Sequence, residues 1–339
     1  MTNVLIIDLT PFFGGGQKFI ENLYINTCNP EKYHFIVSDH ELFKRLPTGQ
    51  KELLKTDFGI YKILNFINSY IEAHKISNVL LNGNRPIYFA PFIKANHIIG
   101  YRHTSNNAFK GLKKIIGGLL LNFSFFWCDK VVVLYQKAVA EIFQDKKTVV
   151  INNGISYPAS VLNRDNDKIP LVILCVTRLD PDKGINWLID QFEVAFQNSE
   201  HVKLKIAGDG MLKKQLTEKI QTLKSNIELL GFVQDVNTLL IESDLFILPS
   251  SFESFPLSIL EAMGHSLPVI ATNTGGISEM IEDGENGFIL DYGSENLSKH
   301  MKFLIENRKV LKEMSRKSYN RMDKFSIKKC VDKIELLLK

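Results

Sequence analysis

The feature that most constrains the fold of this 339-residue chain is a regular alternation of short apolar runs with helix-length segments. Each run has the length of one β-strand and is apolar almost throughout. Parallel strands need long crossover connections, and a sheet covered on both faces has apolar strands. The alternation therefore predicts an α/β chain with parallel sheets. The predicted strands are residues 4–8, 34–37, 79–82, 97–100, 131–134 and 148–151, followed by 171–177, 204–207, 227–230, 246–248, 268–271 and 287–290.

The predicted strands fall into two sets, separated by a segment at residues 152–170 that is rich in Asn, Asp, Ser and Pro. Such a composition is typical of a linker. We therefore expect two domains, residues 1–155 and 156–319. Each is large enough to bury its own core.

Composition excludes several classes of protein. The four cysteines are widely spaced and include no C-x-x-C pair, which favours reduced thiols in a cytosolic protein over a disulfide framework. The apolar run at residues 4–7 is too short for a signal peptide. Polar residues at Asn122, Asp129 and Lys130 interrupt the apolar stretch 115–134, so no membrane-spanning helix is expected. We expect a cytoplasmic protein, either soluble or peripheral at the inner face of the cell membrane.

Residues 246–276 place two carboxylates, Glu253 and Glu261, around the start of one predicted helix. Pro256 is expected in the first turn of this helix, and Gly264 at its end. The free amides at a helix N-terminus attract phosphate oxygens. The two carboxylates are then available for the hydroxyls of a sugar and of a ribose. Two solvent-facing glutamates would fit the same spacing.

A diphosphate near two carboxylates also needs cations. Arg178 and Lys183 supply them, because they follow the predicted strand 171–177 in the loop that opens the next helix. Arg offers a fork of N–H donors and Lys a point charge, and both bind phosphate. The carboxyl end of a parallel strand is also where ligands of open α/β sheets bind.

Taken together, these motifs resemble the retaining glycosyltransferases of family 4, which have the GT-B fold of two facing Rossmann-like domains with a cleft between them. The C-terminal half matches almost throughout, whereas the N-terminal half matches at a glycine loop, at His103 and in its rhythm of strands and helices. The matching segments are Glu253 with Glu261, the R-L-x-x-x-K-G run 178–184, Gly14 to Gly16, AGDG at 207–210, Gly231 with Phe232, Gly275 with Gly276, and DGENGF at 283–288.

The resemblance implies an enzyme that moves a hexose or N-acetylhexosamine, with retention of configuration, from a nucleotide diphosphate sugar to a glycan or polyprenyl-linked acceptor. A UDP-sugar donor and a role in bacterial surface polysaccharide synthesis are expected, with no metal and no cofactor. A helix at about 320–339 is expected to cross back to the first domain. The implied catalytic residues are His103, Arg178, Lys183 and Glu253. The implied donor-binding residues are Gly14, Gly15, Arg178, Lys183, Gly231, Phe232, Val233, Glu253, Phe255, Pro256, Leu257 and Glu261.

Residue roles follow from the same resemblance. Gly14 and Gly15 match a loop that closes over the phosphates and the sugar, and glycines there also allow positive φ and close approach of a ligand. They are not part of a dinucleotide fingerprint, because Phe19 stands where a third glycine is required. His103 is expected to hydrogen-bond the donor sugar. Residues 82–85 depart from the family pattern, which leaves acceptor recognition open.

The reaction breaks the bond between the anomeric carbon and the diphosphate. Arg178, Lys183 and the helix amides near residues 255–257 are expected to stabilise the anionic leaving group. The leaving phosphate is expected to take the acceptor's proton, so no protein base is assigned. Two D-x-D strings, at 165–167 and 180–182, are interpreted as solvated loop acids rather than metal ligands.

Charge is divided unevenly along the chain. Residues 1–160 contain 18 Lys and Arg against 11 Asp and Glu, a net charge of +7, and the remainder carries −3. Within the basic half, Lys110, Lys113 and Lys114 precede a largely apolar segment, 115–127. Residues 108–127 are therefore a predicted peripheral membrane contact. A core helix that leads into the next strand is the alternative. Nucleic acid is not expected as a partner, because the net charge is modest and no nucleic-acid motif occurs.

Two other functions are compatible with the same scaffold, namely a nucleotide-sugar epimerase and a catalytically silent binding module. A silent copy would be expected to lose Arg178, Lys183 or Glu253, and all three are present. The transferase is therefore the favoured prediction.

Overall fold

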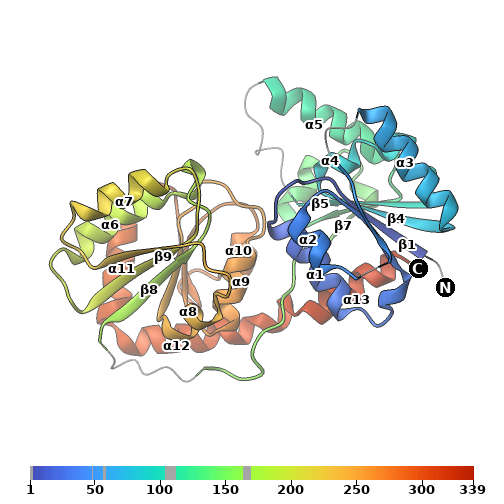
Figure 1. Cartoon of the computed structure of the whole chain (residues 1–339). Coiled ribbons are helices and arrows are strands. Elements are labelled where there is room, and N and C mark those ends of the chain that lie inside the picture. The colour runs from blue at the N-terminus through green and yellow to red at the C-terminus, as the bar shows by residue number, and fades with distance from the viewer. Residues whose placement is uncertain (1–2, 48, 56–58, 104–111, 163–168) are drawn as a thin grey trace. The chain divides into compact units, whose positions relative to one another are not determined.

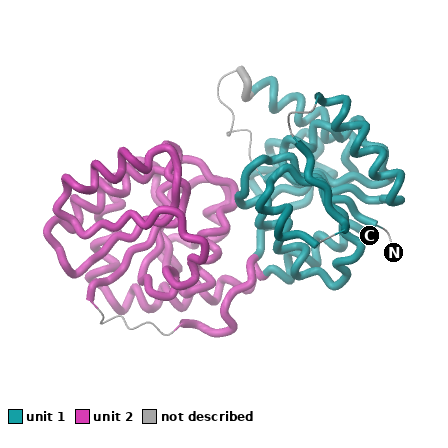
Figure 2. Tube along the Cα trace, viewed as in Figure 1, with its two compact units in different colours: residues 1–154, 327–339 teal, residues 155–326 magenta. Residues whose placement is uncertain are grey.

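The computed structural model describes residues 3–47, 49–55, 59–103, 112–162 and 169–339. The chain forms two compact units (Figure 2). Unit 1 consists of Met1–Gly154 together with Ile327–Lys339, and unit 2 of Ile155–Ser326. Each unit has one parallel sheet with helices packed around it (Figure 1). The predicted α/β architecture is confirmed, and each predicted strand overlaps an observed one.

The sheet of unit 1 has seven parallel strands in the order β3-β2-β1-β4-β5-β6-β7. The sequence did not predict β3, because this short edge strand, Lys-Glu-Leu, has no apolar run. The strands are β1 (Asn3–Asp8), β2 (Tyr33–Val37), β3 (Lys51–Leu53), β4 (Ile76–Asn82), β5 (His97–Arg102), β6 (Lys130–Val133) and β7 (Thr148–Val150). The helices are α1 (Gly15–Asn26), α2 (His40–Arg45), α3 (Ile60–Ala73), α4 (Asn84–Ile87), α5 (Leu112–Ser124) and α13 (Ile327–Leu337).

The sheet of unit 2 has six parallel strands in the order β10-β9-β8-β11-β12-β13. Its strands are β8 (Leu171–Val176), β9 (Val202–Ala207), β10 (Ile227–Gly231), β11 (Leu245–Leu248), β12 (Val269–Thr272) and β13 (Gly287–Leu290). Its helices are α6 (Ile185–Phe196), α7 (Lys213–Gln221), α8 (Asn237–Glu242), α9 (Leu257–Gly264), α10 (Ile277–Met280), α11 (Asn296–Glu306) and α12 (Arg308–Arg321). The central strands β8 and β11 are buried almost completely, as expected of strands covered on both faces.

The strand order defines one switch point in each sheet. In unit 1 the chain winds outward in opposite directions from β1 and β4, and in unit 2 from β8 and β11. At such a point the connections leave the carboxyl ends of two adjacent strands on opposite faces, so the loops there diverge and leave room for a ligand. The loops after β1, β4, β8 and β11 are therefore the places in each unit where a binding site is expected.

The last helix, α13, packs on α1 within unit 1 and is held there by a carboxylate. Glu335 accepts hydrogen bonds from the hydroxyls of Thr27 and Tyr33 and pairs with Lys32, whose Nζ lies 2.7 Å from Oε2. This helix begins at Ile327 rather than near residue 320, because α12 continues to Arg321 in unit 2 and Ser326 has an extended backbone.

Replacing Glu335 with Ala should lower the stability of unit 1 by about 1–3 kcal/mol. The reason is that Lys32 and Tyr33 would lose their hydrogen-bond acceptor on α13. The chain has two tryptophans, Trp127 in unit 1 and Trp187 in unit 2. Urea unfolding of a Trp187→Phe background, followed by Trp127 fluorescence, measures unit 1 alone. Asp332→Ala, at an exposed position of the same helix, is the control and should change little. Equal effects of the two substitutions would contradict the assigned role of Glu335.

Candidate functional site

A buried lysine and a glutamate meet at the switch point of unit 2. Lys183 follows β8, Glu253 follows β11, and their Nζ and Oε1 atoms lie 2.9 Å apart. The lysine is 9% exposed. Its Nζ also donates to the carbonyl oxygen of Phe252 at 3.3 Å and lies 3.3 Å from Oδ2 of Asp182. Three acceptors match the three donors of an ammonium group. The structure thus brings together two predicted residues that are 70 positions apart in the sequence.

The two loops that carry this pair are tied together by their backbones. The N–H and the hydroxyl of Ser251 both donate to the carbonyl oxygen of Asp182, at 2.8 and 3.0 Å. Gly184 has φ of +67° and lies against Pro249, so that a Cβ would overlap the Pro249 carbonyl oxygen. Only glycine fits this position, because both the conformation and the space exclude a side chain.

The cations of this loop are not free. Arg178 is largely exposed, and its Nη1 lies 2.9 Å from Oδ2 of Asp180. Asp182 approaches Lys183. The acids of the second D-x-D string lie in a loop, with side chains 17% and 41% exposed, and both carboxylates also pair with the cations that flank them. The first string, at 165–167, lies outside the described residues.

Glycines from neighbouring loops complete the framework of the site. Gly275 has φ of +56°, and a Cβ there would overlap the backbone of Glu253 and Ser254. The N–H of Gly276 donates to the Ser254 carbonyl oxygen at 2.7 Å. The AGDG motif packs in the same way on the Arg178 loop, since a Cβ on Gly208 would overlap the Thr177 carbonyl oxygen. These glycines serve the close approach of loops to one another.

Helix α9 begins next to Glu253. Pro256 is the N-cap residue, one position before the predicted first turn, and no side chain caps the amides of α9. Phe255 is buried and packs on Phe325, with ring centroids 5.8 Å apart. Leu257 and Glu261 are partly buried. Gly264 is the last helical residue, and it makes room for Tyr157 rather than adopting a left-handed cap.

The other predicted donor-binding residues of unit 2 lie at the end of β10. Gly231 has φ of +71°, and its carbonyl oxygen accepts from the N–H of Gly208 at 2.7 Å. Phe232 is 76% exposed, and Val233 is partly buried beside it. An aromatic ring this exposed has no packing role in the unit.

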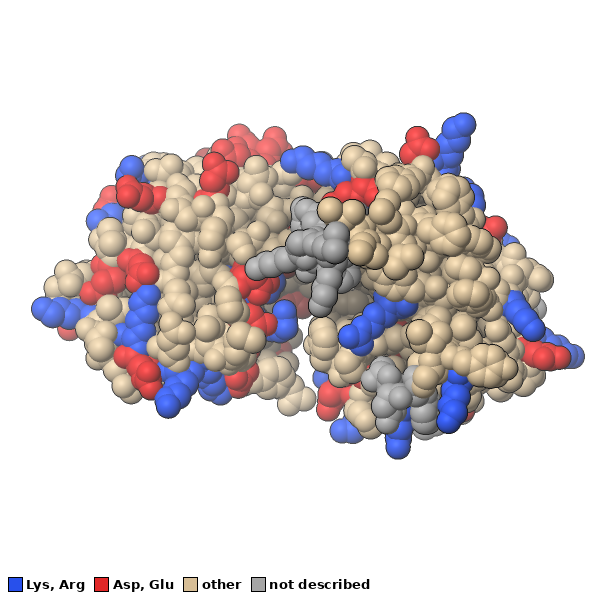
Figure 3. Space-filling model, turned by 90° about the horizontal axis from the view of Figure 1, so that it is seen from above, with Lys and Arg blue, Asp and Glu red and all other residues tan. Residues whose placement is uncertain are grey.

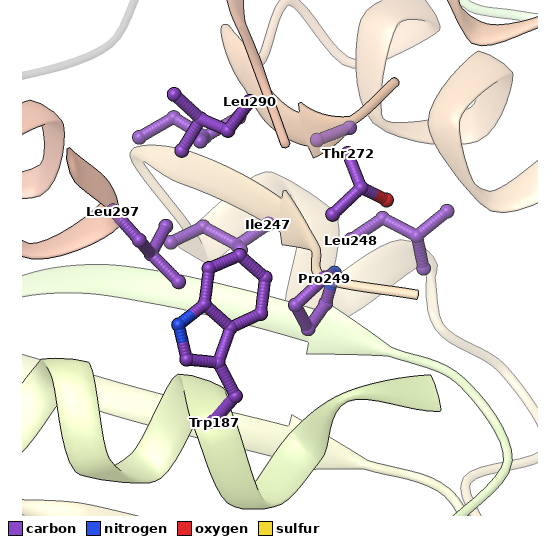
Figure 4. Close-up of a pocket in the computed structure, with 9 residues that line it drawn as sticks. Trp187, Ile247, Leu248, Pro249, Thr272, Leu290 and Leu297 are labelled. Carbon is purple, nitrogen blue, oxygen red and sulfur yellow. The ribbon is translucent and has the colours of Figure 1, made fainter. Parts of the chain in front are cut away.

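A small apolar pocket also lies among the strand ends of unit 2, between Trp187 and the residues that close β11 and β12 (Figure 4). It has no room for a water molecule. We regard it as a packing gap and not as the site, because none of the paired charges lines it.

The glycine loop of unit 1 leads directly into helix α1. Gly14 has an extended backbone with φ of −161°, helix α1 begins at Gly15, and none of the three glycines has a positive φ. The conformational freedom of glycine is therefore not used here. A Cβ on Gly15 would meet no atom within 4 Å. Neither the backbone conformation nor the packing within unit 1 requires a glycine at position 15.

A buried polar network lies behind this loop, at the switch point of unit 1. Asp8 ends β1 and accepts hydrogen bonds from the N–H of Thr10 at 2.8 Å, from Gln17 Nε2 at 2.9 Å and from Asn82 Nδ2 at 2.6 Å. Asn82 ends β4, and its Oδ1 lies 2.6 Å from Nε2 of His103. Sequence reasoning missed Asp8, Gln17 and Asn82 as site residues. The signal available was a polar residue at the end of each of two central strands.

His103 directly follows β5, which extends to Arg102. Its ring stacks on Tyr101, with centroids 4.7 Å apart, and lies 5.4 Å from the ring of Phe19. Desolvation by these neighbours lowers the pKa of His103 to about 3, so the imidazole is neutral at physiological pH. Arg102 is buried and pairs with Glu141 at 2.5 Å, which makes it a structural residue.

Within the described residues, no cluster of three or more His, Cys, Asp or Glu side chains is arranged to hold a metal ion. The described helices also include none with the length and hydropathy needed to cross a bilayer.

Comparisons with known proteins agree with this geometry. Residues 170–307, most of unit 2, match the family model described as glycosyl transferases group 1. The UDP-Gal:alpha-D-GlcNAc-diphosphoundecaprenol alpha-1,3-galactosyltransferase of Escherichia coli is 30% identical in an alignment that covers 58% of this chain and 55% of that enzyme. The GalNAc-alpha-(1->4)-GalNAc-alpha-(1->3)-diNAcBac-PP-undecaprenol alpha-1,4-N-acetyl-D-galactosaminyltransferase of Campylobacter jejuni is 23% identical in an alignment that covers 96% of this chain and 95% of that enzyme.

Among solved structures, HepE of Anabaena in complex with UDP-glucose is similar, with a TM-score of 0.83 at 21% identity over 99% of both chains. Two parallel-sheet units and such structural relatives define the GT-B fold of glycosyltransferases. Over residues 170–307 the chain is similar to the glycosyl transferases of group 1. The predicted resemblance to a GT-B glycosyltransferase is confirmed.

Gly184→Ala should lower the stability of unit 2 more than Gly293→Ala. Both glycines have positive φ, at +67° and +82°, so both substitutions carry a similar conformational cost. Only Gly184 adds an overlap, with the Pro249 carbonyl oxygen, whereas Gly293 has open space. We expect an additional loss of about 1–3 kcal/mol for Gly184→Ala. Urea unfolding followed by Trp187 fluorescence in a Trp127→Phe background gives the difference, and equal losses would contradict the tight contact between the loops.

Proposed function

We propose that the protein is a retaining, metal-independent glycosyltransferase of family 4 that uses a UDP-sugar. The observation that carries the proposal is the contact of Lys183 with Glu253 at the switch point of unit 2. Arg178 and the uncapped amides of α9 belong to the same set of loops. Cations and amides suit a diphosphate, whereas a carboxylate suits sugar hydroxyls. The presence of UDP-glucose in the HepE complex and the UDP-Gal donor named for the Escherichia coli relative support UDP as the nucleotide.

Binding of a diphosphate has to overcome the carboxylates already present. The described cluster contains two cations, Arg178 and Lys183, against three carboxylates, Asp180, Asp182 and Glu253. We propose that phosphate oxygens replace Asp180 and Asp182 as partners of the two cations, while Glu253 keeps its contact with Lys183. The side chain of Asp182 is 41% exposed, so it is free to turn toward solvent, whereas that of Glu253 is 16% exposed.

The proposed reaction transfers the glycosyl group to an acceptor hydroxyl. The bond between the anomeric carbon and the diphosphate oxygen breaks, and its electron pair stays on the diphosphate, where Arg178 and Lys183 stabilise the charge. The acceptor oxygen attacks the anomeric carbon from the same face, and its proton passes to the leaving phosphate. Glu253 orients the sugar. By the resemblance to family 4, His103 contacts the sugar from unit 1.

Substitutions in the cluster should have opposite effects on UDP affinity. Lys183→Ala and Glu253→Ala are each expected to abolish turnover with the fold intact, and Lys183→Ala to weaken UDP binding at least about tenfold. Asp182→Asn removes a competing charge and should tighten UDP binding. Calorimetric titration of UDP measures affinity, and release of UDP from UDP-sugars, assayed with EDTA present, measures turnover. Normal transfer by Lys183→Ala or Glu253→Ala would contradict the proposed site, and loss of all activity in EDTA would contradict metal independence.

We propose further that the acceptor is a polyprenyl-linked glycan and that unit 1 rests on the cytoplasmic face of the membrane through α5. Both relatives named above have undecaprenol-linked substrates in their names, which supports the first part. The second part is supported by an apolar surface that we call the α5 face. It consists of residues of α5 and of the following turn, η4 (Phe125–Trp127), that are 43–61% exposed: Ile115, Ile116, Leu119, Leu120, Phe123, Phe126 and Trp127.

The described residues of segment 108–127, from Leu112 onward, are compatible with both interpretations on different faces of α5, and residues 108–111, with Lys110, lie outside the described residues. Leu121 and Phe125 are buried in unit 1, so α5 is also a core helix that leads into β6. Contiguous apolar surface of this kind is unusual on a protein that contacts only water. Lys147 lies beside it, because its Nζ donates to the carbonyl oxygens of Phe126 and Cys128. In the view from above, much of the surface on this side of unit 1 carries neither acidic nor basic residues (Figure 3).

The chain should co-sediment with vesicles that contain phosphatidylglycerol, and more weakly at high salt. Phe123→Glu combined with Trp127→Glu should abolish binding, because two carboxylates would have to enter the lipid interface. Val194→Glu, at a 66% exposed apolar position of unit 2, is the matched control and should bind like the unchanged protein. Equal vesicle binding by the double variant and the control would contradict the role of the α5 face.

A further inference from the structure

The buried network at the switch point of unit 1 fixes the orientation of one side-chain amide. Asn82 is fully buried, and its Nδ2 faces the Asp8 carboxylate at 2.6 Å and the carbonyl oxygen of Gly16 at 3.3 Å. The Gly16 carbonyl oxygen can only accept. Burial raises the pKa of Asp8, whereas the N–H donors of Thr10 and Gln17 favour its ionised form, in which it too can only accept. A flipped amide would place an oxygen against two oxygens. The amide nitrogen of Asn82 must therefore face Asp8, and Oδ1 must face His103.

The orientation of Asn82 decides the tautomer of His103. Asn82 Oδ1 lies 2.6 Å from His103 Nε2, and an amide oxygen can only accept. Nε2 must then carry the proton. In a neutral imidazole the other nitrogen, Nδ1, is left as an acceptor. Nδ1 has no hydrogen-bond partner among the described residues.

We propose that Asp8, Gln17 and Asn82 are positioning residues that hold His103 as the Nε2–H tautomer, so that Nδ1 accepts a hydrogen bond from a sugar hydroxyl. Asp8 is 1% exposed and Gln17 is 3% exposed, so water does not compete for their hydrogen bonds. Gln17 Nε2 lies within 3.0 Å of both Asp8 oxygens and keeps the carboxylate in place. The proposal deepens the proposed function, because the hydroxyl would belong to the transferred sugar.

Neutral histidine suits this role, and the burial that lowers the pKa of His103 is consistent with it. The site would then distinguish sugars by whether they offer a hydroxyl donor at this point. A sugar that lacks that hydroxyl would leave Nδ1 without a partner.

The tautomer can be measured without any substrate. In protein labelled with ¹⁵N-histidine, long-range ¹H–¹⁵N spectra distinguish Nε2–H from Nδ1–H for each of the eight histidines. The His103 signals are those lost in His103→Gln. We expect Nε2–H at neutral pH in the unchanged protein, and a mixture of tautomers in Asn82→Ala. Asn78→Ala is the matched control, because Asn78 is also buried on β4 but donates to the carbonyl oxygen of Leu338. It should leave the tautomer unchanged.

Kinetics separate positioning from a structural role. Asn82→Ala should lower kcat about tenfold or more with a smaller change in the KM for the donor, whereas Asn78→Ala should change neither. If Asn82→Ala does not fold, Asp8→Asn takes its place, since it keeps the shape but removes the charge that orients Asn82. Any one of three results would overturn the proposal. These are an Nδ1–H tautomer in the unchanged protein, an unaltered tautomer in Asn82→Ala, and a changed tautomer in Asn82→Ala with unaltered kcat. If the tautomers are as expected but the protein transfers sugar from no donor, the role of the network stands and the proposed function is overturned instead.

Discussion

The close approach of two loops in unit 2 is the constraint on which the rest of the site depends. Gly184 lets the loop after β8 lie against Pro249, and Ser251 binds the Asp182 carbonyl oxygen from the other side. This contact is what brings Lys183 to Glu253. A partly buried ion pair gains little stability on its own, because desolvation offsets the attraction. The proposed diphosphate sugar would use both groups of this pair.

The two switch points use different electrostatics. Unit 2 presents charged side chains, with Arg178 largely exposed. In unit 1 the only charge of the described network, Asp8, is fully engaged with N–H donors, and the group that remains available is a neutral imidazole. Charge suits a diphosphate, and a neutral acceptor suits a hydroxyl.

Much of this structure could be predicted from residue order. Apolar runs identified the strands because parallel strands are buried on both faces. Sequence analysis assigned Lys183 and Glu253 to one site, whereas the adjacency of their strands and the ion pair itself come from the structure. The network around Asn82 was missed because its members come from three separate segments and only the fold brings them together. The pairing of Asp180 and Asp182 with the cations was not predicted, because a loop sequence does not show which way its acids turn. The conformation of the Gly14 loop could not be predicted, since an extended backbone and a left-handed one both accept glycine.

A crystal structure of the chain with UDP-glucose tests the central claim most directly. The account predicts that diphosphate oxygens lie within about 3 Å of Lys183 Nζ and of the Arg178 guanidinium, with Asp182 turned away from Lys183 and Glu253 still beside it. A nucleotide bound elsewhere, or a diphosphate that contacts neither cation, would contradict it.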